Sequence, residues 1–485
     1  MKRILAFDFG ASSGRAMLGR LEDGRIAMEE IHRFSNDPVT VGGRMYWDVL
    51  RLFFEIKAGI TKAVAAGGFD AISIDTWGVD YGLIGQSGRL LSNPRHYRDQ
   101  RTAGMPEKVF RRVPKEELYA LTGIQFSTIN TLYQLAADME EDPELFALAD
   151  KMLMTPDLFG YLLTGEVHEE ATIASTSNLF DPRTRDWHWD LIHRLGLPRR
   201  LFAPILQPGS VYGYLSDELC EELGCPKAPV IAVGAHDTAS AVAAAPAEGD
   251  FAYISCGTWS LFGTELPEPL INADSAAANF TNEGGFSGTV RFLKIISGLW
   301  LVQESRRQWR REGQEVSFAE LEQEALEATP FVSYINVDDP AFATAGNTPA
   351  RIREYCVRTG QPVPESRGEV MRCIYQSLAF TYRRTLEKLE QITGKRYARI
   401  HMIGGGIKDR LLCQMTADAC GVEVLAGPVE ATAMGNIGAA LCAFGELKDL
   451  ADLRRAVAAS TDLQRYVPKD ASAFANAYEG FLRSI

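Results

Sequence analysis

The sequence lacks the features that mark several large classes of protein. No run of eighteen apolar residues occurs among its 485 residues, so we predict no transmembrane helix. Its eight cysteines show no CxxC spacing and have no paired histidines nearby, so we predict no structural zinc and a reducing compartment. The net charge is −13 without a cluster of lysine or arginine, so we expect neither nucleic acid nor an anionic membrane as a partner.

The composition that remains is that of a globular protein with a small partner. Hydrophobic residues make up 46% and charged residues 23% of the chain, with no low-complexity segment. This length is typical of about two to four folding units. Asp8 interrupts the initial apolar stretch "MKRILAFDFG" before a signal peptide can form, so we predict a cytoplasmic protein. We also expect a monomer or a small homo-oligomer.

The first part of the chain combines strands with a helix. Three short alternating segments between residues 3 and 34, separated by glycine-bearing turns such as "EDGR", predict an antiparallel meander. The stretch "WDVLRLFFEIKAGITKAVAAG" has helical periodicity and ends at glycines, and "DAISIDTW" returns to a strand pattern. The class is therefore α/β.

Near residue 245 the pattern indicates a boundary between two lobes, 1–245 and 246–485. The stretch "APVIAVGAHDTASAVAAAP" predicts a buried strand and an alanine-rich helix ended by Pro246. Beyond it, "FAYISCGTWSLFGTEL" repeats the plan of the opening stretch, which indicates an internal duplication. A third glycine turn, "HMIGGGIKDRLL", precedes a helix whose free amides favour an anion. Three such turns predict a phosphate-rich ligand held between two lobes.

The turn after the first strand has two interpretations. Gly10 to Arg15 is not the GxxxxGK[ST] loop, because no lysine follows the second glycine, and it could be an ordinary β-hairpin. Asp8 at the strand end suits a hydrated Mg²⁺, which uses few protein carboxylates, and Arg15 could offset phosphate charge. Thr258 in the second hairpin has the same two interpretations, phosphate contact or a plain strand residue.

Asp237 in "AHDTASAV" also has two interpretations. An aspartate before an alanine-rich run is a good helix N-cap. Near a helix N-terminus its ionised form is stabilised, and an ionised carboxylate can accept a proton from a substrate hydroxyl. A carboxylate whose oxygens are all occupied by helix amides would make a poor base.

The stretch "IDTWGVDYG" places four residues of interest on a strand, a turn and a second strand. Asp75, Trp77, Gly78 and Asp80 could receive a sugar on the tryptophan edge and the open glycine backbone, or Trp77 could only fill the core. His236 is one of seven histidines and has no partner motif, so a structural role is the alternative to a catalytic one.

Residues spread over nearly the whole chain resemble one family. The stretch 404–440, "GGGIKDRLLCQMTADACGVEVLAGPVEATAMGNIGAAL", is similar to the C-terminal signature of the FGGY carbohydrate kinases. The other stretches that match this family are "FDFGASSGR", "IDTWGVDY", "YRDQRT", "GAHDTASAV", "SCGTWSL" and "GLWLVQE". The resemblance implies two actin-like, ribonuclease H-like lobes with an inter-lobe cleft, 1–245 binding the sugar and 246–485 the nucleotide.

The resemblance also implies a role for individual residues. Asp8 would lie near Mg²⁺ and Asp237 would be the general base. Substrate contacts would come from Gly78, His236, Asp237 and Thr238. Contacts to ATP would come from Ala11, Ser12, Ser13, Gly14, Arg15, Thr258, Gln303 and Gly405.

The implied reaction joins ATP and a small-molecule ketose. Among such kinases the match points to phosphorylation of L-rhamnulose at O1, giving L-rhamnulose 1-phosphate and ADP. The alternatives are a kinase of another deoxyketose such as L-fuculose, and a non-catalytic actin-like regulator that binds sugar and ATP.

Two positions depart from the family pattern. Ile295 follows Lys294 where the family carries an asparagine that touches the sugar, which implies the loss of one hydroxyl contact. Asp409 replaces an asparagine common after the triple glycine, which implies an added charge near the nucleotide.

Overall fold

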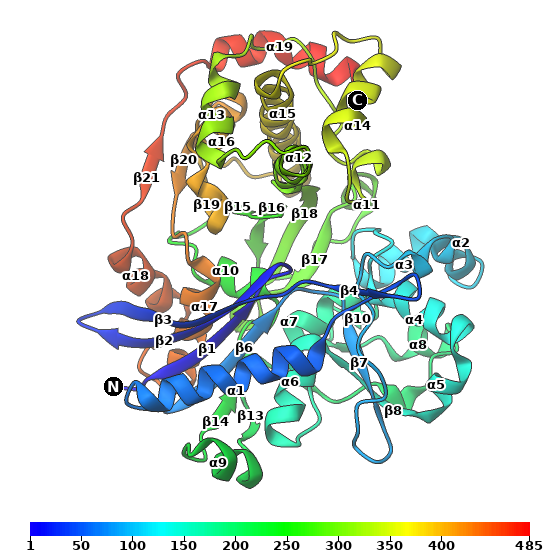
Figure 1. Ribbon diagram of the computed structural model, residues 1–485, viewed down its shortest axis with the longest axis vertical. Coiled ribbons are helices and arrows are strands. Elements are labelled where there is room, and N and C mark those ends of the chain that lie inside the picture. The colour runs from blue at the N-terminus through cyan, green and yellow to red at the C-terminus, as the bar shows by residue number, and fades with distance from the viewer. The chain divides into compact units, whose positions relative to one another are not determined.

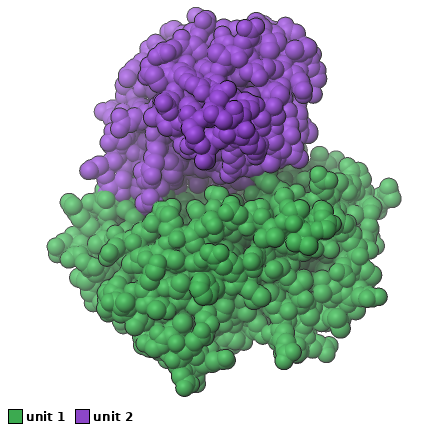
Figure 2. All heavy atoms as spheres, viewed as in Figure 1, with its two compact units in different colours: residues 1–246, 265–292, 431–460 green, residues 247–264, 293–430, 461–485 purple.

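A computed structural model describes all residues of the chain, 1–485, and shows two compact units. Unit 1 consists of Met1–Pro246, Glu265–Phe292 and Ala431–Ser460, and unit 2 of Ala247–Thr264, Leu293–Glu430 and Thr461–Ile485 (Figure 2). The chain first passes from unit 1 to unit 2 after Pro246 and later returns twice. The assignment of sugar binding to the first lobe and nucleotide binding to the second stays a prediction.

The main sheet of unit 1 has the order β13-β14-β6-β1-β2-β3 (Figure 1). Its strands are β1 (Ile4–Phe9), β2 (Ser13–Glu22), β3 (Arg25–Ser35), β6 (Ala71–Thr76), β13 (Val211–Tyr214) and β14 (Pro229–Ile231). The first three strands form the predicted antiparallel meander, and Asp23 and Gly24 both adopt positive φ in the turn between β2 and β3. This conformation matches the twist of a tight hairpin. The meander is confirmed.

The predicted first helix is confirmed as α1 (Val49–Ala65). Asp48 caps it by accepting a hydrogen bond from the Arg51 amide, and Gly67 and Gly68 follow it with positive φ. The absence of a side chain at Gly59 lets this helix approach the sheet, since a Cβ there would lie 2.6 Å from the Phe7 ring. Phe7 therefore faces α1, and the alternation of side chains along β1 places Asp8 on the opposite face of the sheet.

A second sheet has the order β17-β18-β16-β15-β19-β20-β21 (Figure 1). Its strands are β15 (Ala252–Cys256), β16 (Trp259–Leu266), β17 (Thr281–Gly284), β18 (Val290–Ser297), β19 (Arg399–Ile403), β20 (Glu423–Ala426) and β21 (Gln464–Tyr466). β15 pairs antiparallel with β16 and parallel with β19, as β1 does with β2 and β6. Both sheets continue to a further parallel strand and then an antiparallel edge strand. The predicted duplication is confirmed.

Helices surround both sheets. In unit 1 they are α2 (Met105–Phe110), α3 (Lys115–Thr122), α4 (Thr131–Glu141), α5 (Pro143–Leu148), α6 (Thr155–Thr164), α7 (Ala171–Ala174), α8 (Trp189–Arg194), α9 (Asp217–Leu223), α10 (Asp237–Ala243), α11 (Ala273–Ala277), α17 (Ala431–Ala443) and α18 (Leu450–Ser460). In unit 2 they are α12 (Trp300–Arg311), α13 (Phe318–Glu327), α14 (Thr348–Arg358), α15 (Arg367–Thr393), α16 (Arg410–Cys420) and α19 (Ala471–Arg483). None of these helices combines the length and apolar character needed to cross a membrane.

Several shorter elements complete the chain. The remaining strands form two-stranded pairs: β4 (Val39–Val41) with β5 (Arg44–Tyr46), β7 (Tyr81–Gly85) with β8 (Ala149–Met154), β9 (Glu169–Glu170) with β12 (Ile205–Leu206), and β10 (Phe180–Asp181) with β11 (Asp186–Trp187). Single 3₁₀ turns are η1 (Gln100–Thr102), η2 (Ser175–Ser177), η3 (Arg199–Leu201), η4 (Phe286–Gly288), η5 (Pro340–Phe342) and η6 (Gly405–Lys408).

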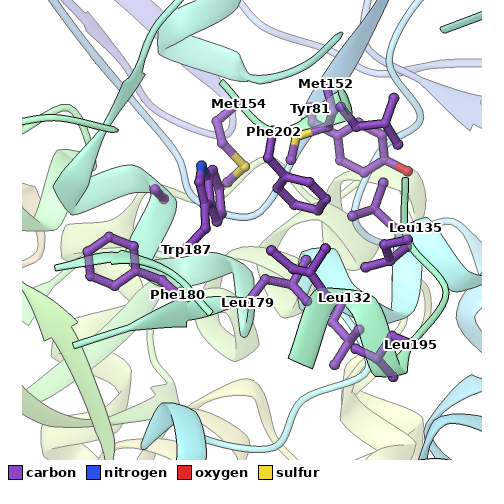
Figure 3. Packing of buried hydrophobic residues seen from close by; sticks show 14 of the residues in the cluster. Tyr81, Leu132, Leu135, Met152, Met154, Leu179, Phe180, Trp187, Leu195 and Phe202 are labelled. Atoms are coloured by element: carbon purple, nitrogen blue, oxygen red, sulfur yellow. The ribbon is translucent and has the colours of Figure 1, made fainter. Parts of the chain in front are cut away.

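A separate hydrophobic cluster in unit 1 lies beside the main sheet and anchors the segment that follows β6. Figure 3 shows Trp187 and Phe202 packed among Met152, Met154 and Tyr81, and the first two rings make an edge contact with centroids 5.0 Å apart. Burying each such side chain contributes about 1.5–3 kcal/mol. Because Tyr81 is the first residue of β7, this cluster fixes the far end of the turn that carries residues 77–80.

Candidate active site

Four of the residues named in the sequence analysis, Asp8, Asp75, His236 and Asp237, lie at one edge of the main sheet of unit 1. This edge is formed by the carboxyl ends of three parallel strands. β1 and β6 pair with Asp8 opposite Asp75, and β6 continues into a bridge between Thr76 and His236. Asp237 follows directly as the first residue of α10. Ligands of open α/β sheets bind beyond the carboxyl ends of the strands. This edge of the first sheet is therefore the candidate site of unit 1.

The opening hairpin places Asp8 against Arg15. These residues face each other across the β1–β2 ladder, and a guanidinium nitrogen of Arg15 lies 2.6 Å from the Asp8 carboxylate. Ala11 and Ser12 form the turn, and Ser13 begins β2. Asn36 holds this turn by donating from its side chain to the Gly10 carbonyl at 2.9 Å. The turn is thus fixed in shape, with a cation and a carboxylate at its base.

Gly14 has a packing reason of its own. A Cβ at this position would lie 2.3 Å from the ring of Phe34 on the neighbouring strand β3. The close approach of this ring explains the glycine without a ligand. The predicted contact of Gly14 with ATP stays a prediction.

Asp75 is a buried carboxylate that the sequence did not assign a definite role. Its side chain accepts a hydrogen bond from Asn436 of α17, whereas its Oδ1 has no hydrogen-bond partner. Burial, and then the negative charge of Asp8, raise the pKa of Asp75 well above its ordinary value. A positive ion or a proton at this edge would offset that repulsion.

The structure tests one of the two local interpretations of Asp237, the N-cap. His236 occupies the N-cap position of α10 without a side-chain capping bond, and Asp237 is the first helical residue. The Asp237 carboxylate accepts from the Thr238 hydroxyl at 3.0 Å and lies 3.4 Å from Nε2 of His236. Its side chain is 30% exposed. The N-cap interpretation is therefore wrong, and the carboxylate retains acceptor capacity toward solvent.

Gly78 and His236 lie together. A Cβ on Gly78 would be 3.3 Å from Nε2 of His236 and 3.4 Å from the Thr176 methyl group. Glycine therefore keeps the space in front of this nitrogen open. The next residue, Val79, has a φ of +70°, which is a strained conformation for a β-branched residue. Such strain is concentrated at functional sites.

The tryptophan of this segment belongs to the core. Trp77 is buried, lies against Trp47 with ring centroids 4.1 Å apart, and donates its indole N–H to Asp80 at 2.9 Å. Asp80 also accepts from Trp47 and Gln134, and burial raises its pKa to about 6. The interpretation of Trp77 as a sugar platform is therefore wrong.

In unit 2, the second hairpin brings Thr258 and Gln303 together. Thr258 lies in the turn between β15 and β16, and its hydroxyl donates to the side-chain carbonyl of Gln303 at 3.3 Å. The first turn of α12 packs on this hairpin, because the Trp300 amide donates to the Thr258 carbonyl at 3.0 Å. Two residues 45 positions apart in the sequence thus form one polar pair.

In the triple glycine beside β19, the local structure explains two of the glycines and leaves the third unexplained. Gly404 has a φ of +89°, and a Cβ on Gly406 would lie 2.5 Å from the Cys256 sulfur. A Cβ on Gly405 would meet nothing within 4 Å. Gly405 therefore presents open backbone in unit 2.

The predicted anion site at the helix after this turn is wrong. The amides of Leu411 and Leu412 at the start of α16 donate to the carboxylates of Glu322 and Asp409, at 2.8 and 3.0 Å. Two protein carboxylates thus occupy the donors that an anion would need. Asp409 is the N-cap of α16, where aspartate and asparagine serve about equally, and burial raises its pKa to about 6. Its difference from the family pattern is therefore compatible with the local fold.

Ile295 lies in β18 next to Lys294. Burial lowers the pKa of Lys294. The structure places both residues in unit 2. The loss of a sugar contact through Ile295 stays a prediction.

Sequence reasoning missed four residues that support the site in unit 1. Asn436 and Gly435 come from α17, more than 350 positions after Asp75, and Glu283 and Arg291 form a buried ion pair at 3.2 Å beside His236. Burial alone would raise the pKa of Glu283, but the Arg291 guanidinium, together with His236 and Thr281, outweighs this effect, and the pKa lies below its usual range. The dipeptide Gly-Asn inside an apolar helix is the sequence signal that could have indicated Gly435 and Asn436. No sequence signal indicates Glu283 and Arg291.

Comparison with solved structures shows the class of fold. The crystal structure of ligand-bound xylulose kinase from Lactobacillus acidophilus covers 99% of this chain with a TM-score of 0.82 at 17% identity, over 97% of its own chain. Gluconate kinase from the same organism gives a TM-score of 0.81 at 17% identity, with coverage of 99% and 97%. The fold is that of the two-lobed, actin-like sugar kinases.

The sequence comparisons identify the family. Residues 3–244 match the FGGY family of carbohydrate kinases, N-terminal domain, and residues 252–444 match its C-terminal domain. The rhamnulokinase of Bacteroides thetaiotaomicron is 44% identical over 99% of both chains, and that of Enterococcus faecalis 42% identical over 99% of this chain and 98% of its own. The chain belongs to the FGGY family of carbohydrate kinases. It is a carbohydrate kinase.

Proposed function

We propose that this kinase transfers the γ-phosphoryl group of ATP to O1 of L-rhamnulose, giving L-rhamnulose 1-phosphate and ADP. Support for the substrate comes from similarity over almost the full length to proteins named rhamnulokinase in several organisms. Support for the chemistry comes from one observation above all: the Asp237 carboxylate lies at the helix N-terminus but is not used to cap it.

Asp237 is proposed as the general base. The sugar O1–H bond breaks as its proton passes to the carboxylate, the O1–Pγ bond forms, and the bond from Pγ to the β,γ-bridging oxygen breaks to release ADP. The partial exposure of the Asp237 carboxylate leaves room for the sugar hydroxyl. His236 and Thr238 lie against this carboxylate, and Gly78 leaves space beside Nε2 of His236, so these three residues are proposed to contact the sugar.

Mg²⁺ is proposed to accompany ATP at Asp8. No group of three or more His, Cys, Asp or Glu in the chain could hold a metal ion by itself. Mg²⁺ usually uses only one or two carboxylates together with waters and substrate phosphates, so Asp8, with Asp75 beside it in register, fits that requirement. When bound, the ion would neutralise phosphate charge. The unpartnered oxygen of buried Asp75 supports this placement.

The contacts proposed for ATP are divided between the two hairpins. Ala11 to Arg15 would supply turn amides and a guanidinium, and Thr258 and Gln303 would supply the polar pair of unit 2. Gly405 would bring open backbone to the nucleotide. Phosphoryl transfer depends chiefly on positioning and charge stabilisation, which such groups provide.

The substrate assignment predicts a ranking of sugars. L-rhamnulose with Mg-ATP is expected to give the highest kcat/KM in a coupled ADP-release assay over a panel of ketoses and polyols that includes L-fuculose. Mass spectrometry and NMR of the product should place phosphate on O1. A polyol or another ketose with clearly higher kcat/KM would overturn the assignment, and no sugar-dependent ADP release at all would favour a regulator without turnover.

Thr258→Val is expected to raise the KM for ATP by about tenfold or more, because one hydrogen bond to a charged phosphate is lost. The KM for the sugar should change by less than about twofold, and thermal stability should remain close to that of the unchanged protein. Steady-state kinetics with each substrate varied in turn measures both constants.

Thr381→Val provides the matched control in the same unit. The Thr381 hydroxyl donates to the Ser377 carbonyl of its own helix, α15, so its loss should leave both KM values unchanged. If Thr258→Val left the KM for ATP unchanged as well, Thr258 would have no part in nucleotide binding.

A further inference from the structure

The ring of His236 is held by a buried ion pair that the proposed reaction does not use. Nδ1 of His236 lies 3.0 Å from a guanidinium nitrogen of Arg291 and 3.4 Å from the carboxylate of Glu283. The Arg291 side chain is fully buried, and its Nε donates to the Gly284 carbonyl at 2.8 Å. Arg291 is thus fixed from two sides, by Glu283 and by a backbone carbonyl.

The contact with Arg291 decides which nitrogen of His236 carries the proton. A guanidinium has only N–H donors, so an atom at hydrogen-bond distance from it must be an acceptor. A proton on Nδ1 would face the guanidinium N–H at 3.0 Å. Nδ1 therefore accepts, and in the neutral ring the proton lies on Nε2.

The backbone around His236 is fixed as well. The His236 amide donates to the Thr172 hydroxyl oxygen at 3.2 Å, and that hydroxyl donates to Glu170. The Ala235 amide donates to the same Glu170 carboxylate at 3.2 Å. Both the ring and the main chain of His236 therefore have one defined position.

From these contacts we infer that Arg291, held by Glu283, is a positioning residue that keeps His236 as the Nε2–H tautomer and so makes Nε2 a hydrogen-bond donor to the sugar. The inference rests on the proposed function for the identity of the sugar. Nε2 lies 3.4 Å from the Asp237 carboxylate, and Gly78 leaves space in front of it.

With this tautomer, His236 and Asp237 form a pair of one hydrogen-bond donor and one hydrogen-bond acceptor. Asp237 accepts from the hydroxyl that attacks phosphate, and His236 donates to an oxygen on the neighbouring carbon of the sugar. A ketose presents this arrangement at C1 and C2, where a hydroxyl lies next to a carbonyl oxygen that can only accept. The donor on Nε2 would therefore help select a ketose, and it depends on Arg291.

The tautomer is measured directly by NMR of the full chain with ¹⁵N-labelled histidine and without substrate. The His236 signals are assigned by their loss in His236→Gln. The inference expects an unprotonated Nδ1 and a protonated Nε2 near neutral pH. A protonated Nδ1, in the other neutral tautomer or in the imidazolium, overturns it. Because this readout needs no turnover, it holds or fails independently of the substrate assignment.

Kinetics then tests whether Arg291 acts through His236. The double variant Arg291→Met with Glu283→Leu removes both buried charges, so that neither is left unpaired. It is expected to lose the single tautomer and to raise the KM for the ketose about five- to tenfold, the effect of one hydrogen bond, with the KM for ATP within about twofold. Arg291→Lys retains a donor and should retain the Nε2–H tautomer.

The half-buried pair Arg454 and Glu265, 2.7 Å apart in the same unit, provides the control. Arg454→Met with Glu265→Leu should leave the His236 signals and the KM for the ketose unchanged. An unchanged tautomer in the Arg291 and Glu283 double variant would overturn the positioning role. If that double variant does not fold, the His236 tautomer is measured by NMR in Arg291→Lys and in the unchanged protein. Loss of the Nε2–H tautomer in Arg291→Lys would also contradict the inference.

Discussion

Asp237→Asn is expected to lower kcat by about 10²- to 10⁴-fold while leaving folding and ATP binding nearly unchanged. The amide keeps the size of the carboxylate and can still accept from the Thr238 hydroxyl, but it cannot take the proton of the sugar hydroxyl. Steady-state rates and thermal unfolding, measured on the same preparations, separate the loss of catalysis from a loss of fold. An Asp237→Asn enzyme within about tenfold of the unchanged rate would remove Asp237 from the role of base.

Asp217→Asn is the matched control for this substitution. Asp217 is likewise the first residue of a helix, α9, where Ser216 is the N-cap, but its side chain is 87% exposed and pairs only with Lys227. Its replacement should leave kcat unchanged. Asp237→Ala should lower kcat as Asp237→Asn does, and because the carboxylate makes no capping bond, the stability loss should stay below about 1 kcal/mol.

Gly435→Ala is expected to destabilise unit 1 by about 2–3 kcal/mol. Helices α10 and α17 cross here, side by side in Figure 1, and a Cβ on Gly435 would lie 1.8 Å from the Ser240 carbonyl oxygen. Backbone cannot rotate away as a side chain can, so the helices must separate. The separation would also displace Asn436 from Asp75, and activity should fall with stability. Scanning calorimetry measures the transition.

Gly480→Ala tests whether this effect comes from the crossing or from glycine in a helix as such. Gly480 lies inside α19, and a Cβ there would meet only the Tyr334 ring at 3.6 Å, an ordinary contact. Alanine is favoured over glycine in a helix by about 1 kcal/mol, so this variant should be neutral or slightly more stable. Equal stability of Gly435→Ala and Gly480→Ala would contradict the packing argument.

Local sequence patterns predicted the elements that depend on neighbouring residues. The meander of β1 to β3, the helix α1 and the β15–β16 hairpin follow from period and turn residues, because both act within a few positions. The duplication was visible because two hairpins repeat one local pattern. Long motifs resembling the FGGY family extended this reading to the whole chain.

The same local patterns were insufficient where two partners compete for one group. Asp237 has the sequence of an N-cap, yet His236 takes that position. The amides after the triple glycine were expected to be free, yet Glu322 reaches one of them from a different helix, 89 positions away. Trp77 donates to Asp80 and packs on Trp47, which no spacing indicates.

The sequence by itself determined the class of fold, the two hairpins and, through family motifs, Asp8 and Asp237 as the candidate metal and base residues. Only the tertiary structure placed Asp75 beside Asp8, Asn436 on Asp75 and Arg291 on His236. The physical reason is that strand and helix patterns depend on short-range sterics and burial, whereas hydrogen-bond partners of buried groups are set by which distant segments the packed core brings within about 3 Å.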